Sequence, residues 1–191
     1  MRFFTLFRRL SCALVVGGLA LGGSSVGAWE LAGTKTIRLH GRDGQVIPVG
    51  TVRFEPRGEQ VAFSVMMDRT RFKDFFLSMR EFKCVEGVDE IQCHVPYPYA
   101  NPATVSATDF AWLEHSLLFF YKQPKDFGAK LWNGVYYPLT RTAQGLVGKP
   151  QAVDLNLIGV PPDNLAVPPF GPAERSDLPA GARWFDKLTI E

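Results

Sequence analysis

Three histidines, His40, His94 and His115, are the residues of this chain best suited to metal binding. They occur without a His-x-His or His-Glu-x-x-His spacing, the patterns that place two imidazoles on one metal ion. A histidine without such a neighbour is more often a surface residue or a core residue whose hydrogen bonds are satisfied. The three could converge only through the fold, so we predict no metal site and no cofactor.

Nucleophilic and acid–base catalysis also lack a signature in the sequence. There is no Gly-x-Ser-x-Gly elbow around a serine. The acidic group Glu86, Asp89 and Glu90 falls in an expected hairpin turn, where water would keep the carboxylates ionised. Asp109 and Glu114 flank the turn at Trp112, where Asp109 suits the first turn of a helix. A solvated turn is favoured over a glycosidase pair. A hydrolase stays open as an alternative, because triads are spatial arrangements, but the sequence favours a protein that is not an enzyme.

Aromatic side chains remain as the chemistry suited to recognition, since they combine apolar rings with polar tips. Tyr97, Tyr99 and Trp132 lie on expected connections, where an exposed ring needs a reason. The phenylalanines that follow residue 71 are expected either to cover an open end of a sheet or to form a lid over a ligand cavity. The candidate ligand-binding residues are therefore Phe72, Phe75, Phe76, Tyr97, Tyr99 and Trp132.

The first 28 residues have the features of a secretory signal peptide. Arg2, Arg8 and Arg9 precede an apolar run from Leu10 to Leu21, and Val26–Ala28 has the small-x-small pattern of a cleavage site. The apolar run is too short to cross a bilayer as a helix, although a retained anchor is the alternative. We predict a periplasmic or secreted protein with no stable membrane span after signal cleavage.

Removal of this leader changes the charge balance. Of the 21 basic residues three lie in the leader, which leaves 18 against 19 acidic residues in the mature chain. Nucleic-acid binding needs a clustered basic face, and the sequence contains no long basic run. We therefore predict no nucleic-acid partner. The remaining 163 residues are enough for one domain with a substantial core.

Removal of the leader also removes Cys12, which leaves two cysteines. Both lie in an expected hairpin. The segments Phe82–Val85 and Ile91–Val95 flank a five-residue loop, so that Cys84 falls opposite Cys93. Facing positions of an antiparallel pair lie within disulfide range, and exported proteins meet an oxidising environment. We predict a Cys84–Cys93 disulfide, with a metal pair or a redox couple as the less favoured alternatives.

Alternating apolar residues and turn signals predict a chain dominated by β-strands. The expected strands are 34–40, 45–55, 61–68, 82–85, 91–95, 117–121, 134–140 and 146–157, the last with a break at 148–150. Short helices are expected at 72–79, where apolar residues have the i, i+3, i+4, i+7 spacing, and at 109–114. About eight antiparallel strands can close on themselves and remove their exposed edges.

The predicted fold is mainly β: a single antiparallel β-barrel in a calycin-like meander, with one or two short helices and a proline-rich C-terminal tail. A two-sheet β-sandwich is the alternative. Trp29 and Gly33 beside the first strand resemble lipocalin-like barrels over these residues alone, and because the Gly-x-Trp order is missing the resemblance implies no function. The expected division is a signal peptide at 1–28, a barrel at 29–158 and an extended tail at 159–191 that docks on it.

These features predict an exported, non-enzymatic protein that binds a small apolar or amphipathic ligand. The alternative is an interaction module for a cell-envelope protein, which would use Pro96–Pro102 and the proline-rich stretch Pro161–Pro179.

Overall fold

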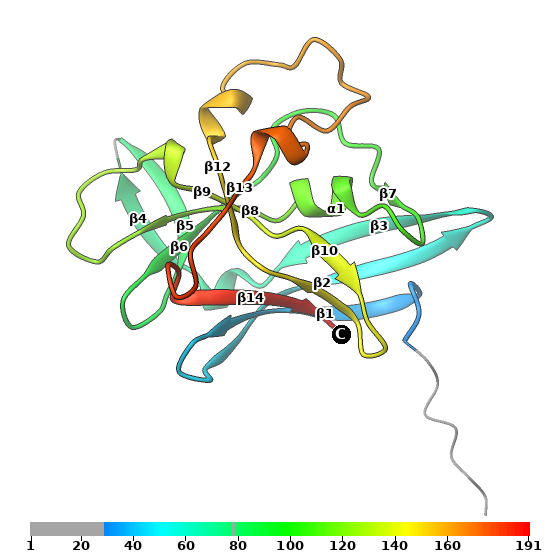
Figure 1. Ribbon diagram of the computed structural model, residues 1–191, viewed down its shortest axis with the longest axis horizontal. Helices are drawn as coiled ribbons and strands as arrows, with labels where there is room; N and C mark the ends of the chain where they lie inside the picture. Colours follow the sequence, from blue (N-terminus) through cyan, green and yellow to red (C-terminus); the bar gives the residue numbers. More distant parts are fainter. Residues whose placement is uncertain (1–28, 78) are drawn as a thin grey trace, which may run out of the picture.

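The computed structural model describes residues 29–191 apart from residue 78, so the predicted signal peptide at 1–28 lies outside the described residues. The described part is mainly β, with two antiparallel sheets of seven strands each and one short α-helix (Figure 1). The predicted mainly β class is confirmed. The strands are divided between two sheets, as in the sandwich alternative, and a single closed barrel is not confirmed.

The first sheet is built on the predicted N-terminal meander. Its strand order is β10-β11-β14-β1-β2-β3-β7. The strands are β1 (Gly33–Gly41), β2 (Val46–Arg57), β3 (Gln60–Met67), β7 (Thr104–Val105), β10 (Leu139–Arg141), β11 (Leu146–Gly148) and β14 (Phe185–Ile190). Alternation along β1 buries Ile37 and Leu39 against the second sheet, which is the period of two expected for a half-buried strand.

The second sheet contains the predicted hairpin. Its order is β13-β12-β9-β8-β6-β5-β4. The strands are β4 (Lys73–Leu77), β5 (Arg80–Glu86), β6 (Ile91–Val95), β8 (Leu118–Lys122), β9 (Gly134–Tyr136), β12 (Gln151–Val153) and β13 (Ser176–Asp177). Helical segments are α1 (Ala111–His115) and the single turns η1 (Arg69–Arg71), η2 (Leu131–Asn133), η3 (Leu155–Ile158) and η4 (Pro172–Glu174). The predicted helical turn and the strand after it correspond to α1 and β8.

Prolines move the chain from one sheet to the other at two places. The expected strand 134–140 divides at Pro138 into β9 in the second sheet and β10 in the first. The expected break before Pro150 separates β11 from β12, again in different sheets. Proline lacks the N–H that a ladder needs, so each proline ends one pairing and frees the chain to begin another. The final expected strand ends at Val153, earlier than predicted, and η3 follows it.

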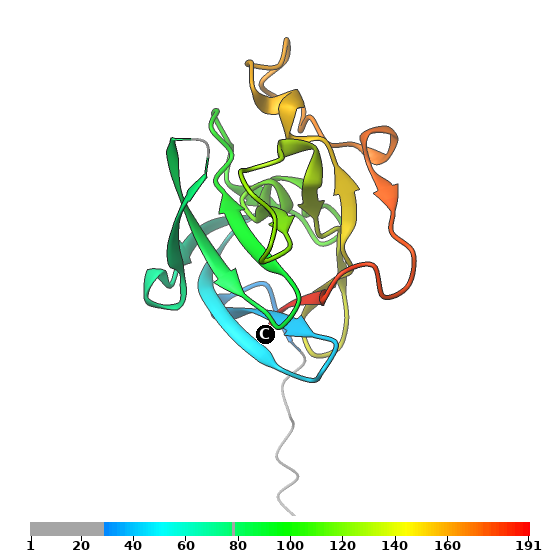
Figure 2. The ribbon, with the colours of Figure 1, turned by 90° about the vertical axis from the view of Figure 1, so that its left-hand side faces the viewer.

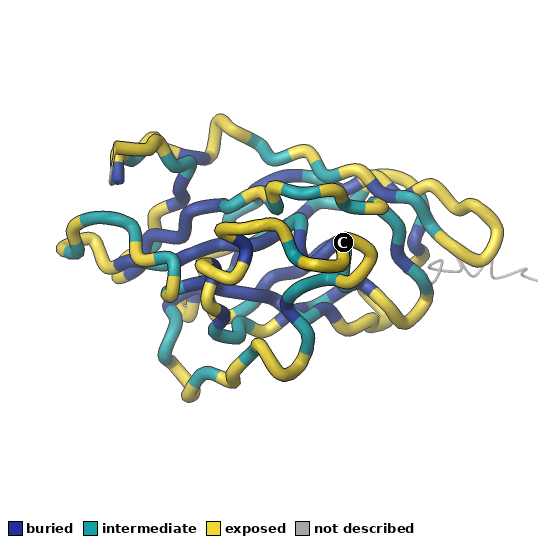
Figure 3. The backbone as a smooth tube through the Cα atoms, turned by 90° about the horizontal axis from the view of Figure 1, so that it is seen from above, coloured by how far each residue is buried: buried dark blue, intermediate teal, exposed yellow. Residues whose placement is uncertain are grey.

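Two apolar clusters lie on opposite faces of the second sheet. One fills the space between the sheets and includes Ile37, Phe119 and Phe185. The other lies on the outer face, where Leu118 and Phe120 pack with Leu155, Ile158 and Phe170. Figure 3 shows the buried stretches of the backbone in the interior, with exposed loops around them. The consecutive apolar residues of β8 are therefore explained by burial on both of its faces. Within the described part of the chain, no helix has the length and the apolar character needed to cross a bilayer.

The predicted disulfide is confirmed. Cys84 and Cys93 are bonded, and they face each other directly in the β5–β6 ladder with their Cα atoms 3.9 Å apart. Both sulfur atoms are buried in the outer cluster. The bond closes a short loop and therefore contributes about 2–3 kcal/mol, mainly by restricting the unfolded chain.

The predicted helix at 72–79 is wrong, because this segment forms β4. It pairs with β5 from Lys73↔Cys84 to Leu77↔Arg80. Its apolar spacing also fits a strand that continues a hairpin, and the β5 ladder supplies backbone partners that an isolated short helix would lack. Met79 allows the tight turn by adopting a positive φ of 64°.

The segment expected to form an extended tail ends as a central strand. β14 lies between β1 and β11, with Leu39 opposite Leu188. Just before it, the Trp184 ring fills the space between the β1–β2 turn and the β5–β6 loop. A Cβ atom on Gly41 or Gly87 would stand 2.4 or 2.2 Å from atoms of this ring. Trp184 therefore links the two sheets.

Candidate ligand-binding groove

An apolar groove of about 590 Å³ lies over the outer cluster of the second sheet. Figure 2 views the molecule from this side and shows the β4–β5 hairpin, residues 123–133 and the segment around η3. The groove is lined by Leu77, Arg80, Phe82, Val95, Pro96, Pro98, Tyr99, Ala129, Leu131, Leu155, Ile158 and Gly159.

The walls of the groove are held by packing and by one hydrogen bond. On the hairpin side the Phe82 ring packs edge-on against Phe120, with centroids 5.0 Å apart. On the opposite side the Tyr99 hydroxyl donates to the carbonyl oxygen of Ile158 at 3.0 Å. The prolines on either side of Tyr97 keep this segment extended. The groove is therefore bounded by four segments that are distant in sequence: 77–82, 95–99, 129–131 and 155–159.

Among the described residues, Arg80 is the only charged one in the groove lining. It forms no ion pair with another described residue, and its neighbours in the groove are apolar or aromatic. An arginine at the edge of an apolar surface is suited to a carboxylate or phosphate group, because its planar guanidinium can donate two parallel hydrogen bonds. The groove thus combines an apolar surface with one positive charge.

The six predicted ligand-binding residues are distributed over several places. Tyr99 lines the groove, and Phe75 packs at the side of the outer cluster. Phe72 is buried between the sheets. Phe76 and Trp132 are exposed beside groove-lining neighbours in the sequence. The sequence analysis did not identify five further groove residues, Arg80, Phe82, Leu131, Leu155 and Ile158. The only local signal was the three-residue spacing of Leu155 and Ile158, which places both on one face of a helical turn.

Tyr97, the sixth predicted residue, lines a second pocket of about 460 Å³ on the other side of the 96–99 segment. The rings of Tyr97 and Tyr99 nevertheless touch, with centroids 5.6 Å apart. His94 also lines this pocket, and its Nε2 atom bonds to the carbonyl oxygen of Ser116 at 3.1 Å. Because that carbonyl accepts, Nε2 carries the proton. Nδ1 of His94 and the Tyr97 hydroxyl are buried and have no partner among the described residues.

Burial lowers the pKa of the His94 imidazole to about 4, against a weaker opposing effect from its bond to Ser116. The unfolded chain binds this proton near pH 6.5, so stability rises with pH between about 4 and 6.5 and falls on acidification. We expect this group alone to reduce the free energy of unfolding by about 2 kcal/mol between pH 7 and pH 5. Urea titration of the wild type and of His94→Gln, which keeps a donor for Ser116, measures the difference. Equal pH dependence in the two proteins would refute the assignment.

The three histidines do not converge on one point. His40 bonds to Oγ1 of Thr189 at 2.8 Å. His115 bonds to the Ala111 carbonyl oxygen at 2.7 Å and accepts from the Phe170 N–H at 3.1 Å. Across residues 29–191, leaving aside residue 78, no group of three or more His, Cys, Asp or Glu is arranged to hold a metal ion. Each histidine has a structural partner of its own.

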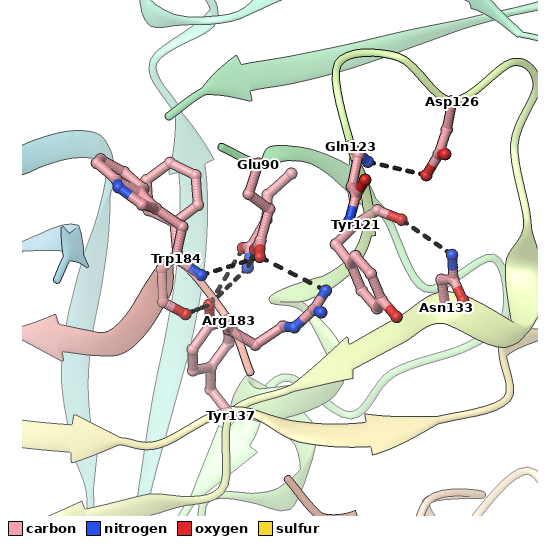
Figure 4. Close-up of polar contacts among 10 residues, drawn as sticks. Glu90, Tyr121, Gln123, Asp126, Asn133, Tyr137, Arg183 and Trp184 are labelled. Atoms are coloured by element: carbon pink, nitrogen blue, oxygen red, sulfur yellow. Dashed lines mark hydrogen bonds and ion pairs between the residues drawn. The ribbon is translucent and has the colours of Figure 1, made fainter. Parts of the chain in front are cut away.

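Glu90, expected in a solvated turn, is buried and only 4% exposed. Its carboxylate accepts from the Trp184 N–H at 3.0 Å and from the side-chain amide of Gln92 at 2.9 Å. Figure 4 shows Glu90 between Trp184 and Arg183. The Arg183 guanidinium lies 3.5 Å from the same carboxylate and stacks 3.2 Å from the centre of the Tyr121 ring. Burial raises the pKa of Glu90, and these partners oppose that shift. This acid joins the C-terminal segment to the hairpin.

Glu114 is also buried, with 7% of its surface exposed, although a helix start predicts a solvated acid. One carboxylate oxygen accepts from the Leu139 N–H at 2.6 Å, and the other accepts from the Tyr136 hydroxyl. Burial raises the pKa of Glu114 and also that of Tyr136, so the phenol stays protonated and remains a donor. The pair fixes α1 against the point where the chain changes sheets.

Comparison with known proteins adds no relationship to this geometry. No family model, no curated protein and no solved structure matches the chain.

The functional assignment therefore depends on the chemistry of the groove. Among the residues that the structure describes, its lining includes no histidine, cysteine or carboxylate, and the hydroxyl of Tyr99 donates to a backbone carbonyl. An apolar lining of this kind is suited to binding.

Proposed function

We propose that the protein is an exported, non-enzymatic carrier that binds an amphipathic ligand in the groove. The ligand has an apolar chain that lies over Phe82, Leu155 and Ile158, and an anionic group that meets Arg80. The observation that carries the proposal is the single guanidinium at the edge of an otherwise apolar lining. The groove has a volume of about 590 Å³, which falls within the range of small-molecule binding sites.

Export is part of the same proposal. The disulfide suits an oxidising compartment, and the leader has the pattern of a signal peptide. A periplasmic or secreted location would also explain the need for a carrier, because amphipathic molecules with long apolar chains are poorly soluble in water.

The proposal predicts that dodecanoate binds the wild type more tightly than dodecanol does. Ile158→Trp places a large side chain in the groove and should weaken binding of both probes at least tenfold, on the order of 1.4 kcal/mol. Arg80→Gln should reduce dodecanoate affinity about tenfold and leave dodecanol affinity nearly unchanged, on the same scale. Isothermal titration calorimetry measures both probes.

Val46→Trp is the matched control, because Val46 is exposed at the start of β2 in the first sheet. It should bind both probes as the wild type does. Binding that survives Ile158→Trp unchanged would show that the groove is not the site. Native mass spectrometry of protein purified from the periplasm then asks whether a ligand accompanies it, and a clean ligand-free mass would count against the carrier role.

The second candidate is a protein-interaction module of the cell envelope. It is favoured by residues 160–167, which expose Val160, Leu165 and Val167 in a proline-rich connection. Cross-linking in intact cells separates the two candidates, since a ligand carrier is recovered alone and an interaction module with a partner.

A further inference from the structure

One edge of β3 is only partly covered by a neighbouring strand. Along its other edge β3 pairs with β2 over its whole length, but on this edge the short strand β7 pairs only with Val61 and Ala62 (Figure 1). The ladder stops just beyond them, because Ala103 has a positive φ of 53° and its N–H donates to the side chain of Asn101 at 2.8 Å. We name residues 64–67 of β3 the open edge.

The backbone of the open edge has hydrogen-bonding groups without a strand partner. Successive peptide groups of an antiparallel strand point to opposite edges. The Phe63 N–H points away from β2, since it donates to the Ala103 carbonyl oxygen at 2.8 Å. By this alternation the N–H and C=O groups of Val65 and Met67 point the same way, and they have no backbone partner among the described residues. They are the groups that an added strand would bind.

The terminal strands of the two sheets are protected in ways that the open edge is not. β7, β10 and β13 are two or three residues long, and β4, which has five, begins with Lys73 and Asp74. Short strands and charged side chains are ordinary means by which proteins keep sheet edges from pairing. The open edge reads Ser-Val-Met-Met and contains no charge and no proline. Its sequence therefore permits a further strand to pair.

A pocket of about 460 Å³ lies beside the open edge. Phe63, Val65 and Met67 line it from β3, and Pro96 and Tyr97, which follow β6, line it from the second sheet. Val65 and Met67 pack against the core between the sheets but are only half-buried. A strand added along the open edge would place every second side chain on this same inner face, so those side chains would enter the pocket and cover the core.

We propose that the open edge binds an extended peptide segment of a partner protein as an added antiparallel strand, with apolar side chains opposite Val65 and Met67. An extended polypeptide offers N–H and C=O groups at every second residue, which is the spacing of the free groups on β3. A second copy of β3 is a poorer occupant, because its inner-face side chains are packed in its own core and cannot enter the pocket. The inference is separate from the carrier function, since the groove has a different lining across the 96–99 segment.

Fluorescence anisotropy of labelled peptides tests the inference on the mature, disulfide-bonded protein. The probes are capped peptides of sequence Lys-Thr-X-Thr-X-Thr-Lys, in which X is Val, Leu or Phe. We expect saturable binding of at least one probe. Methyl groups on the backbone nitrogens of both X residues remove the donors that face β3 and should weaken binding about tenfold. The control peptide has two methyl groups on threonine nitrogens, which face away from β3, and should bind as the unmodified probe does.

Met67→Lys is the first protein variant, because it places a charge at the pocket and should weaken probe binding about tenfold. Met66→Lys is its matched control: Met66 is the adjacent residue, but its side chain is 72% exposed on the opposite face of the strand. It should bind the probe within about twofold of the wild type. Val65→Pro removes one outward N–H without removing a bond to β2, and it should also weaken binding about tenfold.

The inference is overturned if none of the three probes binds, or if the two methylation patterns weaken binding equally. Equal losses in Met67→Lys and Met66→Lys would also overturn it. Self-association of the wild type that Met67→Lys abolishes, without peptide binding, would assign the open edge to a second copy instead. Dodecanoate binding should be unchanged in Met67→Lys, so a failure at the open edge is distinguishable from a failure of the carrier function.

Discussion

Trp184→Ala is expected to lower the free energy of unfolding by about 3–5 kcal/mol, as for large aromatic residues removed from a core. The Trp184 ring is buried between Gly41 of the first sheet and Gly87 of the second, and it packs against Phe185 with centroids 4.6 Å apart. Its removal leaves a cavity at the point where the sheets are joined. Urea titration followed by circular dichroism measures the loss.

The two glycines provide an independent test of the same contact. Gly41→Ala and Gly87→Ala each add a methyl group into the Trp184 ring, so the ring must move and about 1–3 kcal/mol should be lost. Gly171→Ala is the matched control, because its added methyl would meet only the flexible carboxylate end of Glu174, at 3.1 Å. A Trp184→Ala protein within about 1 kcal/mol of the wild type would contradict the role given to this ring.

Glu114→Leu is expected to cost about 3 kcal/mol or more. Leucine has a similar size but accepts no hydrogen bond, so the Leu139 N–H and the Tyr136 hydroxyl would both be left buried and unpaired. Glu114→Gln retains an acceptor and should recover part of the loss. The measurement is again the midpoint and slope of urea unfolding.

The control for this prediction is Glu59→Leu, in the exposed β2–β3 turn, which should change stability by about 0.5 kcal/mol or less. If Glu114→Leu were as stable as that control, the carboxylate would not stabilise the point where the chain changes sheets.

Local chemistry explains which parts of the fold were predictable. The β5–β6 hairpin, the bond between Cys84 and Cys93 and the break before Pro150 all depend on neighbouring residues, and the sequence contains those neighbours. Phe72, Phe75, Phe76 and Met79 have the spacing of a helix, but Phe75 and Leu77 also alternate with Phe76 as in a strand, and the structure buries them in that alternation. The choice of strand depends on pairing with β5, which local spacing does not encode.

The burial of Glu90 and Glu114 and the position of the groove could not be predicted from neighbouring residues in the sequence. Glu90 is buried because Trp184, 94 residues later, donates to it. Glu114 is buried because the chain returns at Leu139. The sequence predicts Tyr99 as a binding residue because it lies in a proline-rich connection. Arg80 has no such local signal, because the apolar residues that line the groove with it come from distant segments. Such sites are properties of the assembled sheets.

The position of β14 has a consequence for biosynthesis. β1 pairs along one edge with β14, and Arg38 and Glu191 are ion-paired across a separation of 153 residues, so this edge of β1 has no partner until β14 is in place. Pairings of such high contact order form slowly, and an open edge is prone to intermolecular association. Until β14 pairs, the open edge of β1 is therefore a site where the incomplete first sheet could associate with another chain.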